Sequence, residues 1–271
     1  MPYVSTDGAR VFYTDSGGHS SSVVVLSHGF FMDLSMFAPQ VEYLEAAGFR
    51  VLCWDARGHG GTVAEPDRPF TYWDSARDLL AVMDAAGVDR AILGGMSQGG
   101  YTILRTALLA PERVQGLILL DTEAGDSPEE QRAEYRQLFD AWTNPEVPLA
   151  NLADGLAPNL IGGTAADQAP WRAKWAASDR SAITQAANCL IERESLLDRL
   201  DEITCPALVL RGEFDGSSTA EKSAALAAGL PGSGPVTTIT GSGHAANWTD
   251  PEPVNDAIGG FLSRLVNSPA R

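Results

Sequence analysis

One stretch of this sequence decides the fold: Ala91-Ile92-Leu93-Gly94-Gly95-Met96-Ser97-Gln98-Gly99-Gly100-Tyr101-Thr102-Ile103-Leu104. It reads as an apolar strand, a serine with glycines two residues away on either side, and the first turns of a helix. The glycines let the strained backbone of so tight a turn close, and the turn pushes the Ser97 hydroxyl out of the fold. The five-residue Gly-x-Ser-x-Gly pattern is short, so its weight comes from the strand before it and the helix after it.

Apolar strands alternate with helices on both sides of this turn. Strands are predicted near residues 23–26, 50–54, 116–120, 206–210 and 236–239, and helices near residues 35–47, 71–86, 98–110, 219–228 and 253–266. Continuous apolar strands separated by helices indicate a mostly parallel sheet covered on both faces. Before them, residues 2–5 and 9–15 flank a Thr6-Asp7-Gly8 turn and predict a hairpin.

The alternation is interrupted once, between about Thr122 and Leu200, where no apolar strand run occurs. This segment is rich in Glu, Arg, Ala and Trp at helical spacing. We therefore expect a helical cap, residues 122–200, inserted into a core formed by residues 1–121 and 201–271.

Charge and cysteine content narrow the class of protein. The 271 residues include 35 acidic and 19 basic side chains, a net charge of −16. Such a surface repels phosphate backbones and anionic membranes, so neither nucleic acid nor a membrane is expected as a partner. The N-terminus lacks the features of a signal peptide, and the three cysteines are far apart without C-x-x-C spacing. We expect a cytoplasmic protein, and its oligomeric state is left open.

A serine hydroxyl needs a base, and the base needs an acid. His244 follows the last predicted strand and would lie at the same carboxyl edge of the sheet as Ser97. Asp215 follows the preceding strand and could fix the imidazole tautomer and offset its developing charge. Glu123, just past the strand that follows the Ser97 helix, is an alternative acid, whereas Glu213 would point away.

The chain order Ser97, Asp215, His244 resembles that of the α/β-hydrolase fold family, and the resemblance covers nearly the whole chain. It is nearest to the serine-nucleophile esterase and lactonase branch, with its enol-lactonases and non-haem peroxidase-like esterases. The resemblance implies a mostly parallel eight-stranded sheet with helices on both faces and a helical cap. It also implies an oxyanion hole made by the N–H groups of Gln98 and Phe30, the latter in a His-Gly-x loop.

These residues lead to an expected activity. Ser97 would attack the carbonyl of an apolar small-molecule ester or lactone and form an acyl-enzyme, which water then hydrolyses. Apolar side chains near the oxyanion loop and in the expected cap are the substrate-pocket candidates: Phe31, Met32, Trp142, Trp171 and Trp175. Phosphate-binding glycine motifs and metal-spaced His/Cys clusters are absent from the sequence, so no cofactor and no metal are expected.

Other functions remain open on the same three residues. A C–C bond hydrolase or a cofactor-free perhydrolase would use the same triad. A slow-turnover ligand receptor could keep the triad without rapid catalysis. A structural scaffold would leave the coincidence of Ser97, Asp215 and His244 unexplained.

Overall fold

The computed structural model describes residues 2–18, 20 and 22–267. Its strands are β1 (Tyr3–Thr6), β2 (Ala9–Asp15), β3 (Val23–Ser27), β4 (Arg50–Trp54), β5 (Val63–Ala64), β6 (Ala91–Met96), β7 (Val114–Leu120), β8 (Ala207–Gly212) and β9 (Thr237–Ile239). They form one sheet in the order β1-β2-β4-β3-β6-β7-β8-β9, with the short β5 paired to β2. Neighbouring strands along β4-β3-β6-β7-β8-β9 are parallel, whereas β2 is antiparallel to its neighbours β1, β4 and β5. The predicted mostly parallel sheet of about eight strands flanked by helices is confirmed.

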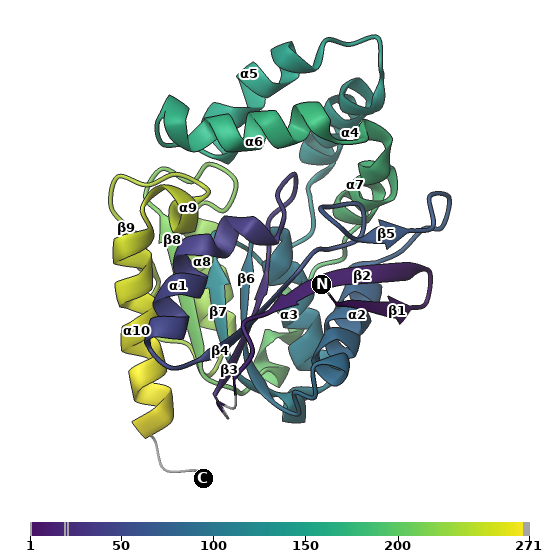
Figure 1. Cartoon of the computed structure of the whole chain (residues 1–271). Helices are drawn as coiled ribbons and strands as arrows, with labels where there is room; N and C mark the ends of the chain where they lie inside the picture. Colours follow the sequence, from purple (N-terminus) through teal and green to yellow (C-terminus); the bar gives the residue numbers. More distant parts are fainter. Residues whose placement is uncertain (1, 19, 21, 268–271) are drawn as a thin grey trace.

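Helices cover both faces of this sheet (Figure 1). They are α1 (Ala38–Ala46), α2 (Tyr72–Ala85), α3 (Gln98–Leu109), α8 (Ala220–Gly229), the short α9 (Ala246–Thr249) and α10 (Pro251–Asn267). The strands between them are buried on both sides, and alternate residues enter different cores. Val24 and Leu26 of β3 pack in the cluster that holds α1 and α10, whereas Val23 and Val25 pack in the cluster that holds α2, α3 and α8.

The helix predicted from residue 35 to 47 is divided. A 3-10 turn, η1 (Leu34–Phe37), comes first, and α1 begins only at Ala38. Pro39 in the first turn of α1 explains the break, because proline has no N–H to donate and its fixed φ suits a helix start. The Asp33 side chain caps η1 by accepting the N–H of Ser35, which fixes the chain just after the loop that carries Phe30 and Phe31.

Between β7 and β8 the chain forms four α-helices: α4 (Glu129–Thr143), α5 (Leu149–Leu160), α6 (Ala165–Ala177) and α7 (Thr184–Ile191). Figure 1 shows them as a layer at one end of the molecule, above the sheet. Their buried residues, among them Phe139 and Trp142, join the core cluster of the α1/α10 face. The segment is helical as expected, while its assignment as a separate cap with boundaries at residues 121/122 and 200/201 stays a prediction.

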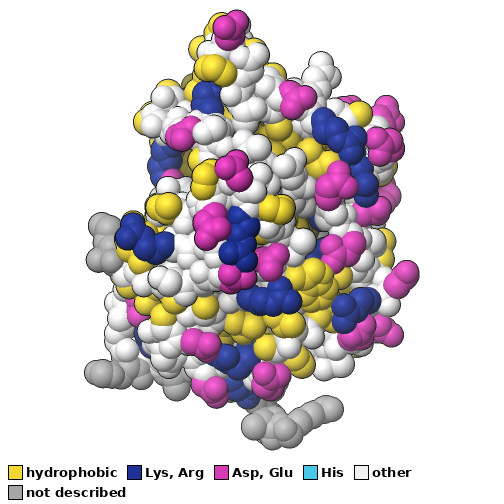
Figure 2. Space-filling model, turned by 90° about the vertical axis from the view of Figure 1, so that its right-hand side faces the viewer, with side chains coloured by type: hydrophobic (Ala, Val, Ile, Leu, Met, Phe, Trp, Pro, Cys, Tyr) yellow, Lys and Arg dark blue, Asp and Glu magenta, His cyan; other side chains and the backbone are white. Residues whose placement is uncertain are grey.

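The charged side chains of one face of the molecule are spread out. In Figure 2, Asp and Glu side chains lie scattered among Lys and Arg over the face in view, without one acidic patch. On this face the net charge of −16 is therefore not gathered into one patch.

Candidate active site

Ser97 sits in the turn between β6 and α3 with φ 51° and ψ −116°, on the side of backbone space that non-glycine residues rarely enter. Strand β7 holds this turn in place. The Ser97 N–H donates to the Leu120 carbonyl (2.9 Å), and the Ser97 carbonyl accepts from the Thr122 hydroxyl (2.8 Å). Glycine is required beside it, because a Cβ on Gly99 would lie 1.9 Å from the Ser27 carbonyl oxygen. The strained, half-buried serine is thus fixed by its neighbours.

His244 and Asp215 lie side by side at the ends of β9 and β8. The distance from His244 Nδ1 to Asp215 Oδ1 is 2.9 Å, and both side chains are buried. The same Asp215 oxygen accepts the backbone N–H groups of Ser217 (2.8 Å) and Ser218 (3.1 Å). With Nδ1 donating to the carboxylate, His244 Nε2 is left as the acceptor that a serine proton needs.

The two side chains shift each other's titration. Burial alone lowers the pKa of His244, but the charge and hydrogen bond of Asp215 outweigh it, so the pKa lies above 6.5. Burial raises the pKa of Asp215, yet His244 and the backbone N–H groups bring it below 3.8. Asp121, at the end of the neighbouring β7, behaves differently: burial and the Asp215 charge raise its pKa well above the usual value.

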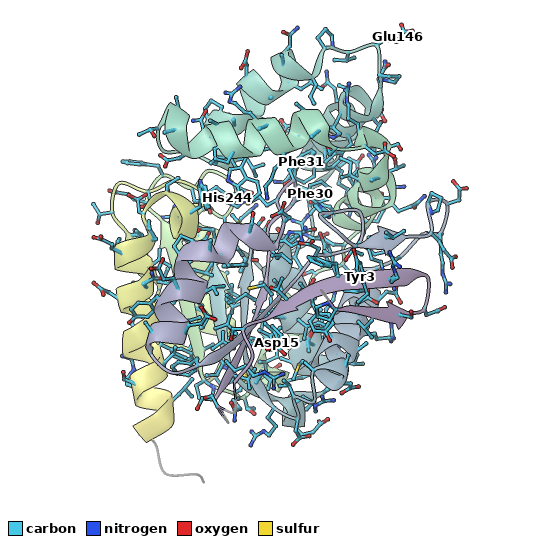
Figure 3. The ribbon with its side chains drawn as sticks, viewed as in Figure 1. Tyr3, Asp15, Phe30, Phe31, Glu146 and His244 are labelled. Carbon is cyan, nitrogen blue, oxygen red and sulfur yellow. The ribbon has the colours of Figure 1, made fainter. Side chains whose placement is uncertain are left out.

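Ser97 and His244 line the same cavity, which has a volume of about 720 Å³. In the described part of the chain no hydrogen bond joins the Ser97 hydroxyl to His244 Nε2, a separation that active sites often close only when substrate is bound. Figure 3 shows Phe30, Phe31 and His244 between the upper helical layer and the sheet. The walls come from the loops at the sheet edge and from α4, α5 and α7.

The alternative acid, Glu123, is engaged elsewhere. Its Oε1 pairs with the Arg193 guanidinium (2.9 Å) and the Lys222 ammonium (3.1 Å), and the side chain is buried. The exposed Glu213 accepts the N–H of Gly241 (2.8 Å) instead of reaching the histidine. Of the three acids weighed from the sequence, the structure brings Asp215 to His244.

Of the two expected oxyanion donors, Phe30 lines this cavity, and Gln98 directly follows Ser97, which also lines it. Gln98 begins α3, where backbone N–H groups lack intrahelical acceptors. Within the described residues neither N–H donates to a protein acceptor, so both are free to meet a substrate oxygen. Their assignment as an oxyanion hole stays a prediction.

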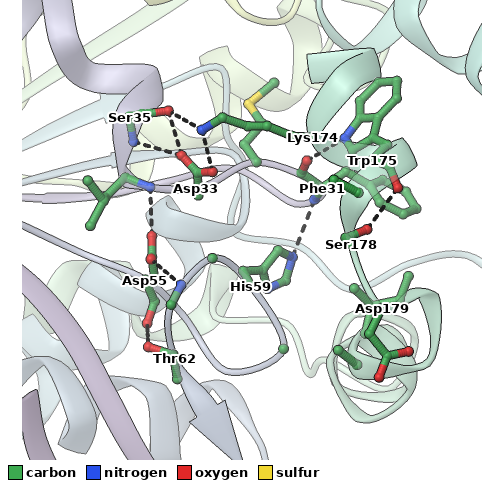
Figure 4. A pocket seen from close by; sticks show the side chains of 18 of the residues that line it. Phe31, Asp33, Ser35, Asp55, His59, Thr62, Lys174, Trp175, Ser178 and Asp179 are labelled. Carbon is green, nitrogen blue, oxygen red and sulfur yellow. Dashed lines mark hydrogen bonds and ion pairs between the residues drawn. The ribbon is translucent and has the colours of Figure 1, made fainter. Parts of the chain in front are cut away.

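The expected pocket wall needs correction. Of the five candidates, Phe31 alone lines the cavity at Ser97. Met32, Trp142, Trp171 and Trp175 line a second hollow of about 710 Å³ on the other side of Phe31, shown in Figure 4. The tryptophans are directed there because they pack between the helical layer and the core: the ring centroids of Trp142 and Phe31 are 4.2 Å apart, and those of Trp142 and Trp175 5.8 Å.

The cavity wall that sequence reasoning missed lies on one face of α4. Gln131, Tyr135, Leu138 and Phe139 all line the cavity, and their spacing of four, three and one residues is that of a single helix face. The opposite wall includes Leu156 and Leu160 of α5 and Leu190 of α7. The helical spacing in the sequence could have found the α4 set, but not the direction in which it faces.

The comparisons with known proteins agree with this architecture. A family model described as the alpha/beta hydrolase fold matches residues 22–251, and the chain belongs to that family. A protein from Synechocystis, named as a non-heme chloroperoxidase, is 26% identical over 97% of this chain and 100% of its own length. Among solved structures, a thermophilic esterase from Thermogutta terrifontis (29% identical, TM-score 0.87) covers 97% of this chain and 98% of its own. The enol-lactonase from Burkholderia xenovorans is 27% identical with a TM-score of 0.84, and the match covers 97% of this chain and 100% of that enzyme's chain.

Two kinds of feature are absent from the described residues. None of their helices is both long enough and apolar enough to cross a membrane. No group of three or more His, Cys, Asp or Glu side chains among residues 2–18, 20 and 22–267 is arranged to hold a metal ion.

Proposed function

We propose that this protein is a serine hydrolase that cleaves a carboxylic ester or lactone of an apolar small molecule through an acyl-enzyme on Ser97. The observation that carries the proposal is the His244–Asp215 pair, 2.9 Å apart, at the cavity that Ser97 also lines. The family membership and the similarity to an esterase and an enol-lactonase support the same reaction class. Residues 122–200 act as a cap over this cavity.

The reaction proceeds in two steps. His244 Nε2 takes the Ser97 proton as the hydroxyl attacks the carbonyl, and returns it to the leaving alcohol as the tetrahedral intermediate collapses. His244 then activates water, which releases the acid and frees Ser97. The N–H groups of Gln98 and Phe30 stabilise the oxyanion, each donor contributing on the order of 3 kcal/mol. Asp215 holds the imidazole and balances its positive charge.

The cavity supports an uncharged, largely apolar substrate. Among the described residues that line it there is no Asp, Glu, Lys or Arg. Its walls are mostly Leu, Phe and Tyr side chains, with a few amide and hydroxyl groups such as Gln131 and Asn159. Apolar walls with few polar groups suit small hydrophobic ligands.

The proposal is tested with a panel of p-nitrophenyl esters, lactones and vinylogous diketones, assayed on the wild type and three variants. Ser97→Ala should remain folded and lose at least about 10³-fold in kcat on esters, because the nucleophile is gone. Asp215→Asn should lower kcat by about 10⁴-fold, because an asparagine at this position favours the wrong tautomer of the His244 imidazole. Glu123→Gln should keep its activity and lose about 3 kcal/mol of stability, because it breaks a buried ion pair.

Ester hydrolysis by Ser97→Ala near the wild-type rate would contradict the proposal. Loss of activity in Glu123→Gln with Asp215→Asn unaffected would make Glu123 the acid. Faster turnover of the diketones than of any ester would favour the C–C hydrolase, and acyl transfer to added hydrogen peroxide in place of water would favour the perhydrolase. A single slow turnover with retained product would indicate a receptor.

A further inference from the structure

The loop that carries Phe30 is held by hydrogen bonds to three successive peptide groups. The Gly29 carbonyl, in the same peptide as the Phe30 N–H, accepts from His28 Nδ1 (2.8 Å). The Phe31 N–H donates to His59 Nε2 (3.3 Å), and the Phe31 carbonyl accepts from Trp175 Nε1 (2.7 Å). Because a trans peptide directs its C=O and N–H to opposite sides, fixing these groups sets where the Phe30 N–H points.

The loop needs this restraint because Phe31 is strained. Its φ is +62°, a left-handed conformation that a bulky side chain adopts only when its surroundings impose it. His59 can restrain it as an acceptor because burial lowers the pKa of this imidazole to about 3, so the ring is neutral. Its other nitrogen, Nδ1, donates to the Arg57 carbonyl (3.0 Å).

Two of these restraints belong to the core, and the third comes from the cap. Trp175 lies on α6, 144 positions along the chain from Phe31. Its neighbour Lys174 makes a second tie: the ammonium donates to Asp33 Oδ2 (2.5 Å) and to the Ser35 hydroxyl (2.6 Å), at the turn that directly follows the loop. Figure 4 shows both ties on the same side of the second hollow.

We propose that α6, through Trp175 and Lys174, is the positioning element that holds the Phe31 backbone and thereby aims the Phe30 N–H at the oxyanion. This inference rests on the proposed function, because it gives a role to the oxyanion donor of that reaction. It makes Trp175 a positioning residue that does not touch substrate: Trp175 lines the second hollow and is absent from the residues around the cavity at Ser97.

The same helix offers a matched control. Trp171 also lies on α6, is likewise buried and lines the same hollow. Within the described residues, however, its Nε1–H has no hydrogen-bond partner. Replacing either tryptophan by phenylalanine removes an indole and keeps an aromatic ring, but only the change at Trp175 removes a hydrogen bond to the loop.

The experiment compares Trp175→Phe, Trp171→Phe, Ser97→Ala and the wild type on one p-nitrophenyl ester. We expect Trp175→Phe to lower kcat by about 10- to 100-fold at unchanged KM, because a small misplacement of a transition-state donor affects rate and not ground-state binding. Inhibition by an aryl trifluoromethyl ketone, which adds to a serine and forms an oxyanion, should weaken in parallel. Trp171→Phe should keep kcat, KM and inhibition close to wild type, and thermal melting reports the fold of each variant.

The outcomes separate this inference from the proposed function. Ester hydrolysis by Ser97→Ala at a rate near that of the wild type would contradict the proposed function. An inactive Ser97→Ala with equal kcat in the two tryptophan variants, or a Trp175→Phe variant that changes KM alone, would overturn the positioning role. If Trp175→Phe does not fold, Lys174→Met tests the second tie: kcat should fall at unchanged KM, and an unchanged kcat would overturn the proposal.

Discussion

At the scale of single residues, three carboxyl groups decide how His244 titrates. Burial lowers its pKa, and the charges of Asp215, Asp121 and Glu123 raise it, with Asp215 contributing most. Asp215 has the largest raising effect because it is hydrogen-bonded to the imidazole, whereas burial and the Asp215 charge raise the pKa of the buried Asp121 well above its usual value. The net result is a histidine that is protonated more readily than a free imidazole.

This shift predicts the pH dependence of the reaction. In the proposed mechanism the neutral form of His244 is the base, so kcat/KM should fall on acidification with an apparent pKa above 6.5. In Asp215→Asn, the residual kcat/KM should fall on acidification with a lower apparent pKa than in the wild type. The reason is that the Asp215 carboxylate is the group that most raises the pKa of His244. The measurement is kcat/KM for a neutral ester from about pH 5 to about pH 9. An acid limb that does not move in Asp215→Asn would contradict the assignment.

The same pair affects stability with the opposite trend. His244, whose pKa is raised on folding, contributes stability that is present below 6.5 and is lost as the pH rises through its folded pKa. Asp215, whose pKa is lowered, contributes above 3.8 and loses this contribution as the pH falls through its folded pKa. The pair therefore stabilises the fold most between these values, below the pH at which the base is most active.

At the scale of elements, the strand-to-helix turn depends on close backbone approach. A Cβ on Gly99, at the start of α3, would lie 1.9 Å from the Ser27 carbonyl oxygen at the end of β3, and one on Gly95 would lie 2.4 Å from the Gly99 carbonyl group. The atoms that an added Cβ would meet first at Gly95 and Gly99 belong to the backbone, so no flexible side chain can move aside to make room. The glycines are thus part of the contact between helix and sheet.

Gly99→Ala should therefore destabilise the protein by about 3 kcal/mol or more, since α3 must move away from β3. The control is Gly155→Ala in α5, where a Cβ meets nothing within 4 Å. That exposed helical position should gain about 0.5–1 kcal/mol, because alanine loses less backbone entropy than glycine. Urea unfolding midpoints measure both changes. A Gly99→Ala variant as stable as wild type would mean that the tight α3–β3 contact is absent.

At the scale of the whole molecule, charge and cavity act together on substrate choice. The protein carries a net charge of −16, and its cavity is lined without Lys or Arg among the described residues. An anionic substrate is repelled on approach and finds no cation inside to compensate.

Salt should therefore distinguish substrates. The kcat/KM for an ester with a carboxylate in its acyl chain should rise severalfold from low salt to about 0.5 M, as screening shortens the reach of the field. A neutral ester of matched length should change little. Equal salt responses for the two esters would show that the net charge does not govern entry.

The sequence predicted the parts of the molecule that depend on local pattern. Runs of neighbouring residues indicate the turn at Ser97, the buried strands and the acidic residue after β8. Because the strands are parallel, their carboxyl ends meet at one edge of the sheet, which brings the residues that follow them together. The tryptophans of residues 122–200 were expected at the substrate, because apolar side chains in a cap suit either a pocket or its packing, and composition does not distinguish the two.

What the sequence by itself determined is the order of strands and helices and the chemical groups placed at strand ends, because these follow from local periodicity. Only the tertiary structure decided which acid meets His244, which face of α4 lines the cavity, and that Trp175 holds the Phe31 carbonyl. Those outcomes depend on how elements far apart in the chain are rotated and packed against one another. Rotating a helix about its axis changes which of its side chains face the cavity, and the local sequence pattern does not specify that rotation.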